Sequence, residues 1–379
     1  MATTNYFSWL SSRRFATAMD DRQFEDKHPR SSGSAHGGEF RTKPETILKQ
    51  DSHSPSEGRK SGRELVPVLY FDENGNERDE KYSPFLKSQG GDGRISKQLN
   101  DILDRLFSGE NVPDEEIEAT PEWSAAMATE RRLAKVLENK YGVTDTSQID
   151  TPERNRYREG IMEAALAETI SKTATIDGFD REFETNEALK PGESYKVAQD
   201  RVAVVAIGFP AAGKSTTYAN PLASKFKARL CDSDAIKKAL PEFENGYGGN
   251  LVHEESTQLN EAVLAQAVER GDNVIYPILG FKPDKLGKVI DCFKEKGYRV
   301  ALCFKDMPVN IAKGRLIVRF LKKGRYLPLS CISKAANGLA GSFNANKGNA
   351  DSYVRSTSGT TYPPKETILE KSGDMLEVG

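Results

Sequence analysis

Residues 208–215 read GFPAAGKS and fit the pattern G-x-x-x-x-G-K-[ST], which is typical of a phosphate-binding loop. Glycines let backbone N–H groups converge on phosphate oxygens, and a following helix N-terminus adds positive potential. In this pattern the lysine reaches the β- and γ-phosphates and the hydroxyl holds Mg²⁺. The alternative is a glycine-rich turn without a ligand. We predict a site for ATP or GTP with Mg²⁺, formed by Gly208, Ala211, Ala212, Gly213, Lys214, Ser215 and the neighbouring Thr216.

Two acids and three arginines favour phosphoryl transfer over the other activities that such loops support. Asp232 and Asp234 follow the second predicted strand, where a small-molecule kinase needs an acid to activate the acceptor hydroxyl. Arg315, Arg319 and Arg325 lie in and just after the last clear helix. The planar guanidinium suits this chemistry because it pairs with phosphate oxygens and spreads their charge. Helix capping by the acids and a solvated face for the arginines are the structural alternatives.

Other classes of phosphate-loop protein fit the sequence less well. A GTPase needs an N/T-K-x-D element for the base, and NKGN at 346–349 is a poor match. A motor or transporter ATPase usually has a long apolar strand that ends in an acid. The strand RVALCFKD at 299–306 ends in Asp306, but Lys305 interrupts its apolar run.

The elements that must position these residues alternate between strand and helix. The run VAVVAIG at 202–208 is apolar without alternation, which is typical of a strand buried on both faces. The pattern predicts an α/β fold in which a parallel sheet is covered by helices on both faces. After the strand at 202–208 we expect a helix at 214–225, then a short strand, an acidic turn and a helix within 228–240, with the strand ending near 231. A helix at 253–272, a strand at 273–280, a helix at 282–298, a strand at 299–306 and a helix at 308–325 should follow.

The remaining segments divide by composition. Residues 1–65 are rich in Ser, Gly, Pro and charge, and we expect them to be mostly disordered. Residues 66–195 predict a helical accessory domain with a short strand at 65–72 and helices within 95–109, 120–142 and 150–174. The kinase domain is predicted over 196–343. The polar residues 344–379 predict a loop or C-terminal tail.

Composition excludes several classes of function. The 54 basic and 56 acidic residues nearly balance, which does not support a nucleic-acid-coating role. The chain has 4 cysteines without a CxxC pair, so we expect reduced thiols in a cytoplasmic protein. No signal-peptide pattern and no run of apolar residues long enough to span a membrane is present, so no membrane association is expected.

The motifs GFPAAGKST, CDSDAIKKALPEF, VHEES, GDNVIYPILG and RLIVRFLKKGRYLP, in this order and spacing, resemble the zeta-toxin family of phosphate-loop kinases. The resemblance covers about residues 198–340. Members of the family phosphorylate UDP-N-acetylglucosamine, and many are paired with an antitoxin. The resemblance therefore implies a kinase with a sugar-nucleotide substrate and an antitoxin partner.

The family's functional residues carry over by position. The resemblance implies that Lys214 and Ser215 bind nucleotide and Mg²⁺, and that Asp234 is the base that accepts the acceptor's proton. It implies that Asp232 shapes the turn or supports Mg²⁺. Arg319 and Arg325 match the lid arginines, with Arg315 as a further candidate.

One departure from the family concerns the acceptor. Family toxins have an acidic EGT after the third strand, which grips the sugar, whereas this chain has YPILG at 276–280. Glu254 or Glu255, in VHEES at 252–256, could replace the lost carboxylate, and the alternative is that both glutamates only favour a helix N-terminus. The departure leaves two other hypotheses open. One is a kinase for a nucleoside, a nucleic-acid end or a protein hydroxyl, and the other is a nucleotide-binding module with little turnover.

Overall fold

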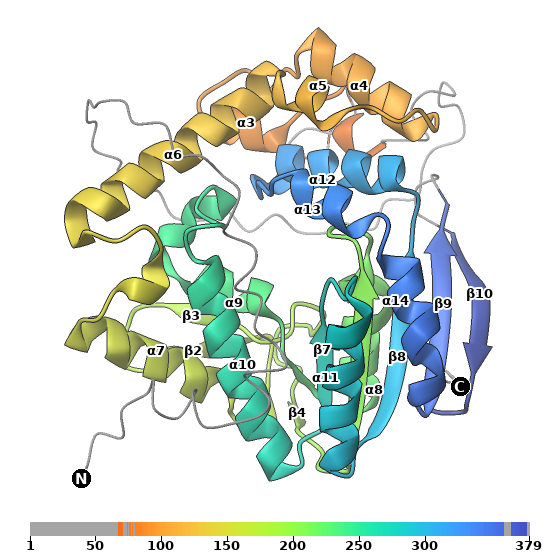
Figure 1. The fold of residues 1–379 in the computed structure, drawn as a ribbon. Coiled ribbons are helices and arrows are strands. Elements are labelled where there is room, and N and C mark those ends of the chain that lie inside the picture. The colour runs from red at the N-terminus through yellow and green to blue at the C-terminus, as the bar shows by residue number, and fades with distance from the viewer. Residues whose placement is uncertain are drawn as a thin grey trace.

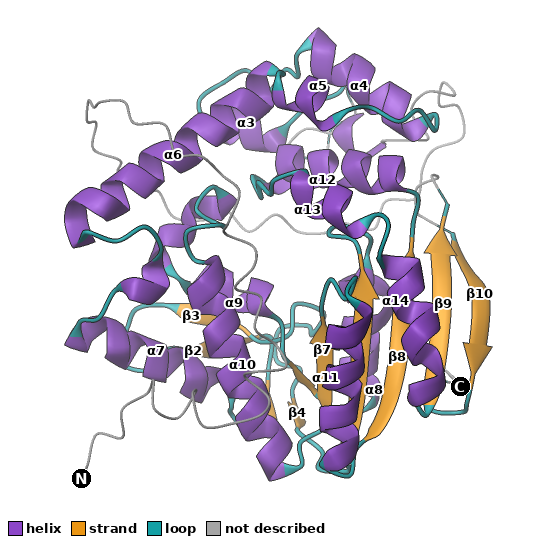
Figure 2. Cartoon of the chain, in the orientation of Figure 1, coloured by secondary structure: helices purple, strands orange, loops and turns teal. Residues whose placement is uncertain are grey.

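The computed structural model describes residues 67–70, 74, 76, 78, 80–359 and 365–376 (Figure 1). The predicted disorder of residues 1–65 lies outside this range. The described chain combines a six-stranded sheet with helices around it and a cap of N-terminal helices (Figures 1 and 2). Within the described residues, no helix has the length and apolar character needed to cross a membrane.

The central sheet confirms the α/β prediction. Its strand order is β10-β9-β8-β5-β7-β6, and its pairs are parallel except for the antiparallel pair of β9 and β10. β5 lies in the middle and is buried along its whole length, as its unbroken apolar sequence predicts. The strands are β5 Val202–Gly208, β6 Arg229–Leu230, β7 Val274–Pro277, β8 Arg299–Asp306, β9 Ser352–Ser358 and β10 Glu366–Ser372.

Helices pack against both faces of the sheet. Alternate residues of β5 enter two separate hydrophobic clusters, one that includes α8 and a larger one that includes α10, α11 and α12. The helices of this half are α8 Asn220–Lys225, α9 Ser233–Ala239, α10 His253–Arg270, α11 Pro283–Glu295, α12 Val309–Lys323, α13 Ser330–Ala335 and α14 Leu339–Asn346. Three further short turns are the π-helical η5 Ser215–Ala219 and the 3₁₀ segments η6 Pro241–Gly246 and η7 Lys347–Asn349.

The C-terminal residues differ from the prediction. The sequence predicts a loop or tail from residue 344, but β9 pairs with β8 and β10 closes that edge of the sheet. The sequence SYVRSTS of β9 alternates between buried and half-buried side chains, and its buried positions are mostly serines. A polar strand of this kind is hidden from a search for apolar runs.

The N-terminal part contains the predicted helices and some strands that were not predicted. Three helices fall within the expected ranges, whereas residues 67–70 form a 3₁₀ turn instead of the expected strand. Two short antiparallel pairs, β1–β4 and β2–β3, follow the last helix. The elements are η3 Pro67–Tyr70, α3 Pro84–Ser88, α4 Lys97–Phe107, α5 Asp114–Glu118, α6 Pro121–Tyr141, η4 Thr146–Gln148, α7 Pro152–Ala165, β1 Thr169–Ile170, β2 Thr173–Thr175, β3 Glu182–Glu184 and β4 Tyr195–Lys196.

The N-terminal helices pack directly on α12 (Figure 1). Gly314 of α12 has no room for a side chain, because an added Cβ would lie 2.7 Å from the Phe107 ring. Trp123 of α6 is fully buried with its ring centroid 5.4 Å from that of Phe320 and 5.3 Å from that of Tyr326. The accessory helices and the sheet half thus share one hydrophobic core.

Candidate active site

The GFPAAGKS sequence forms a tight loop between β5 and the helical turn η5. Gly208 has φ 145° and Gly213 has φ 95°, and Ala211 between them adopts φ 60°. A Cβ at Gly208 would lie 2.6 Å from the carbonyl oxygen of Lys305 on β8, so only glycine fits there. Successive left-handed and right-handed residues turn backbone N–H groups toward a common point, which suits a bound anion.

Lys214 lies against its own loop. Its Nζ donates hydrogen bonds to the carbonyl oxygens of Gly208 at 2.7 Å and Phe209 at 3.0 Å. Burial lowers the pKa of Lys214 to about 8, and the nearby carboxylates of Asp232 and Asp234 oppose that shift. An anion bound beside Lys214 would therefore stabilise the positive charge of its ammonium group.

Ser215 and Thr216 begin the helical turn that follows the loop. Ser215 is half-buried and Thr216 is exposed. Within the described residues, no group of three or more His, Cys, Asp or Glu side chains could hold a metal ion by itself. A hydroxyl from Ser215 and a carboxylate from Asp232 are hard oxygen donors that fit Mg²⁺, provided that phosphate oxygens supply further ligands.

Asp232 and Asp234 lie at the start of α9, beyond the end of β6. Asp232 caps the helix, and one of its carboxylate oxygens accepts a hydrogen bond from the Asp234 backbone N–H at 2.9 Å. Burial, and next the charge of Asp234, raise the pKa of Asp232 to about 6. Burial would also raise the pKa of Asp234, but Arg325, Lys237 and other cations outweigh it and hold that pKa well below its usual value. Asp234 is therefore ionised throughout the neutral pH range, whereas Asp232, with its raised pKa, titrates just below that range.

Arg325 and Arg319 converge on these acids. Arg325 forms an ion pair with Asp234, whose side chain remains 39% exposed and so accessible to a substrate. Burial lowers the pKa of Arg319 to about 9, and the Arg325 charge adds to that shift. The buried Nε of Arg319 has no hydrogen-bond partner among the described residues. A buried donor without an acceptor is costly, and a phosphate oxygen would satisfy it.

Arg315 has a different environment. Its guanidinium donates to the backbone oxygen of Gly359 at 3.0 Å and, at 3.4 Å, to Ala212 in the phosphate loop and to the Ser358 hydroxyl. These contacts tie α12 and the end of β9 to the loop. The structure therefore places Arg315 beside the phosphate loop, with its donors directed at the protein.

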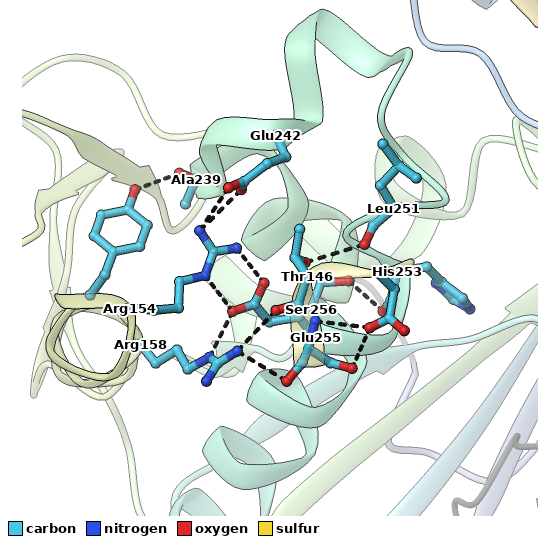
Figure 3. A network of polar contacts seen from close by, with 12 residues as sticks. Thr146, Arg154, Arg158, Ala239, Glu242, Leu251, His253, Glu255 and Ser256 are labelled. Atoms are coloured by element: carbon cyan, nitrogen blue, oxygen red, sulfur yellow. Dashed lines mark hydrogen bonds and ion pairs between the residues drawn. The ribbon is translucent and has the colours of Figure 1, made fainter. Parts of the chain in front are cut away.

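Glu255 is sequestered in the structure. Its side chain is 2% exposed and forms ion pairs with Arg154 and Arg158 of α7 (Figure 3). The hypothesis that Glu255 binds substrate is corrected, because both of its oxygens are already occupied by guanidinium groups. Glu254 is half-buried and accepts a hydrogen bond from Gln258 of its own helix at 2.8 Å.

A comparison with known families gives the same interpretation as the motifs. Residues 186–361 match the zeta toxin family model. The matched region covers a little under half of the chain and contains the phosphate loop, both acids and all three arginines. It also extends past residue 343 to include β9, in agreement with the sheet. No curated protein sequence matches the chain significantly.

Solved structures give weaker similarities. One is described under the PezAT chromosomal toxin–antitoxin system of Streptococcus pneumoniae, with 15% identity over 49% of this chain and 76% of that chain and a TM-score of 0.37. AvrRxo1-ORF1:-ORF2 with ATP has 14% identity over 67% of this chain and 73% of that chain, with a TM-score of 0.38. A putative kinase from Chloroflexus aurantiacus has 18% identity over 37% and 78%, with a TM-score of 0.28. Because these scores are low, the functional proposal depends on the site and on the family match.

The segment 276–280 runs alongside the phosphate loop. Pro277 of β7 is in register with Ala206 of β5, and the Leu279 carbonyl accepts a hydrogen bond from the Gly208 N–H at 3.3 Å. An apolar segment therefore lies directly beside the phosphate loop.

Sequence reasoning missed two charged residues near the acids. The Nζ of Lys237 lies 3.5 Å from the Oδ1 of Asp234. The two residues are three positions apart in one helix, and this spacing can be recognised in the sequence. Glu187, in the β3–β4 connection, contributes to the electrostatics of Arg325 and accepts a hydrogen bond from Asn220 at 3.4 Å. No sequence signal identifies Glu187, because a tertiary contact brings it to the site.

Proposed function

We propose that the chain is an ATP-dependent kinase that transfers the γ-phosphoryl group to a hydroxyl of a small acceptor. The observation that supports this most strongly is the ion pair between Arg325 and Asp234, beside the half-buried Lys214. This ion pair brings together the proposed base Asp234 and a cation for the phosphoryl group, Arg325, next to the phosphate loop. The zeta toxin family match supports the same reaction class.

Each residue of the site has its own role in the proposed reaction. The loop N–H groups and Lys214 bind the triphosphate, with Ser215 and Asp232 as the proposed ligands of Mg²⁺. Mg²⁺, when bound, would neutralise charge on the β- and γ-phosphates. Arg319 and Arg325 face the same site and stabilise the charge of the transferring group.

Asp234 accepts the proton of the acceptor hydroxyl. The acceptor oxygen forms a bond to the γ-phosphorus while the bond from that phosphorus to the bridging oxygen breaks, and ADP leaves. The low pKa of Asp234 keeps it ionised but makes it a weak base. When the phosphoryl group draws Arg325 away, the carboxylate loses its partner and becomes a stronger base at the moment of transfer.

The acceptor proposed first is a sugar nucleotide such as UDP-N-acetylglucosamine, in keeping with the family match. The apolar segment 276–280 and the occupied Glu255 favour a second candidate, a nucleoside, nucleic-acid end or protein hydroxyl. Neither position offers a carboxylate to bind sugar hydroxyls. The mass of the phosphorylated product separates the two candidates.

The test is incubation with γ-labelled ATP, Mg²⁺ and a panel of sugar nucleotides, nucleosides, oligonucleotides and protein substrates. We expect label transfer by the wild type and a loss of about 100-fold or more in Lys214→Ala, because a phosphate-binding charge is removed. Equal transfer by Lys214→Ala, or no transfer to any member of the panel, would refute the proposal.

A further inference from the structure

Helix α7 contacts three consecutive elements that follow the catalytic acids (Figure 3). The Tyr157 hydroxyl donates to the carbonyl of Ala239, the last residue of α9, at 2.5 Å. Arg154 binds Glu242 of η6 and Glu255 of α10. One helix of the N-terminal part therefore fixes the whole stretch from the end of α9 to the start of α10.

Arg154 divides its guanidinium between two carboxylates. Its Nε donates to Glu255 at 2.8 Å, while its Nη1 donates to the Glu242 oxygens at 3.0 and 3.2 Å. Arg158 also binds Glu255, at 2.7 Å, but directs its remaining donors at Asn155 and at the backbone of Thr146 and Ser147. Of the two arginines, Arg154 is thus the one that reaches η6.

The segment that begins with Glu242 leads directly to Arg325. Glu244, Asn245 and Gly246 adopt left-handed backbone conformations with φ of 44°, 57° and 109°. A Cβ at Gly246 would lie 2.7 Å from the Cα of Arg325 and 2.9 Å from the carbonyl oxygen of Gly324. Backbone packs on backbone here, so a displacement of the 241–246 segment is transmitted to the turn that carries Arg325.

We propose that Arg154 is a positioning residue for phosphoryl transfer, which holds the 241–246 segment against the Arg325 turn. In the free protein it so keeps the Arg325 guanidinium at the site, paired with Asp234 until the phosphoryl group binds. The inference rests on the proposed kinase function for its kinetic consequences. Its structural consequence, the pairing of Arg325 with Asp234, does not depend on substrate.

Loss of the tether would be visible in the contacts of Asp234. Lys237 of α9, Lys214 of the phosphate loop, Arg319 of α12 and Arg325 surround the carboxylate, and Asp232 opposes them. If the tether is lost and Arg325 withdraws, Asp234 loses its closest cation and the ion pair between Arg325 and Asp234 is broken.

Arg154→Gln is the test variant and Arg158→Gln is its matched control. Both replace a buried arginine of α7 that binds Glu255, so both should lower the Tm by similar amounts. Only Arg154→Gln is expected to reduce kcat, by about tenfold or more, with a smaller change in the KM for ATP, because misplacement of a catalytic group acts on the transfer step. Glu242→Gln removes the same tether from the other side at a less buried position and should act in the same direction.

The second measurement is the crystal structure of each variant without substrate, which shows directly whether Arg325 still contacts Asp234. We expect this ion pair to be lost in Arg154→Gln and Glu242→Gln and to be kept in Arg158→Gln. An intact pair in Arg154→Gln, or its equal loss in Arg158→Gln, overturns the inference. If the wild type transfers no phosphate, the proposed function fails, whereas loss of the pair confined to the Arg154 and Glu242 variants still supports the tether.

Discussion

Two clusters of arginines and carboxylates lie in this molecule, and they differ in how completely their charges are paired. At the junction of α7 and α10, Arg154 and Arg158 are matched by Glu242 and Glu255 (Figure 3). At the candidate active site the cations outnumber the carboxylates. The site contains Lys214, Lys237, Arg319 and Arg325 around Asp232 and Asp234.

This difference in pairing distinguishes charged side chains that stabilise the fold from charged side chains that are available to bind a ligand. A buried ion pair that is fully hydrogen-bonded offers nothing to a ligand, and its loss mainly destabilises the fold. A buried guanidinium with an unsatisfied donor, such as Arg319, gains most from an anion that arrives from outside. By this criterion the charges of the cluster around Asp234 fit the polyphosphate of the proposed function, whereas the charges of the junction are already satisfied within the protein.

The largest expected effect is the loss of turnover in Arg319→Ala. Removal of an arginine that stabilises the transferring group costs about 10³-fold or more in kcat. The Tm should stay the same or rise, because a buried donor without a protein partner disappears. Steady-state transfer kinetics and thermal unfolding of the same preparation check the prediction, and a large fall in Tm would assign Arg319 to the fold.

Glu255→Gln should show the opposite behaviour. The change removes the carboxylate that Arg154 and Arg158 share and leaves the buried Arg158 without a counter-charge, so the free energy of unfolding should fall by about 3–5 kcal/mol. Urea unfolding measures it. Glu254→Gln is the matched control, because Glu254 makes one hydrogen bond within its own helix, and its effect should stay within about 0.5 kcal/mol. An equal loss of unfolding free energy in Glu255→Gln and Glu254→Gln would contradict the structural role assigned to the junction.

The smallest expected effect concerns Asp232 and pH. Because its folded pKa is raised to about 6, the folded state binds a proton more tightly than the unfolded chain. Asp232 therefore lowers stability progressively as pH rises from its usual pKa to about 6, and the full penalty is present above that. Asp232→Asn keeps a helix cap and should be more stable than the wild type at neutral pH, by about 1–2 kcal/mol, and equally stable near pH 3. Unfolding at both pH values, without nucleotide, tests this; a variant that is less stable at neutral pH contradicts it.

The sequence predicts those parts of the molecule whose signal is local. The unbroken apolar run of β5, the glycines of the loop and the strand–helix alternation each follow from residues close together in the chain, and the structure confirms the fold class. The motifs also predict that Asp234 and Arg325 belong to one site, and the structure pairs the two side chains.

What the sequence does not predict depends on tertiary pairing. In the sequence, Glu255 cannot be distinguished from any other acid at the start of a helix. Its partners Arg154 and Arg158 lie on a helix about 100 residues earlier in the chain, and only the tertiary structure brings them together. β9 buries serines, so its membership of the sheet has no apolar signature. Arg315 has the spacing of a catalytic arginine, but the end of β9 supplies carbonyl and hydroxyl acceptors that the sequence does not reveal.

The central claim is that Asp234 takes the acceptor's proton while the nearby cations hold the phosphoryl group. Single-turnover transfer from γ-labelled ATP, with an acceptor found in the panel, compares the wild type with Asp234→Asn most directly. We predict that Asp234→Asn binds ATP as well as the wild type does and transfers about 10²–10⁴-fold more slowly, the range expected for loss of a general base. Transfer by Asp234→Asn at a rate close to that of the wild type would contradict the account.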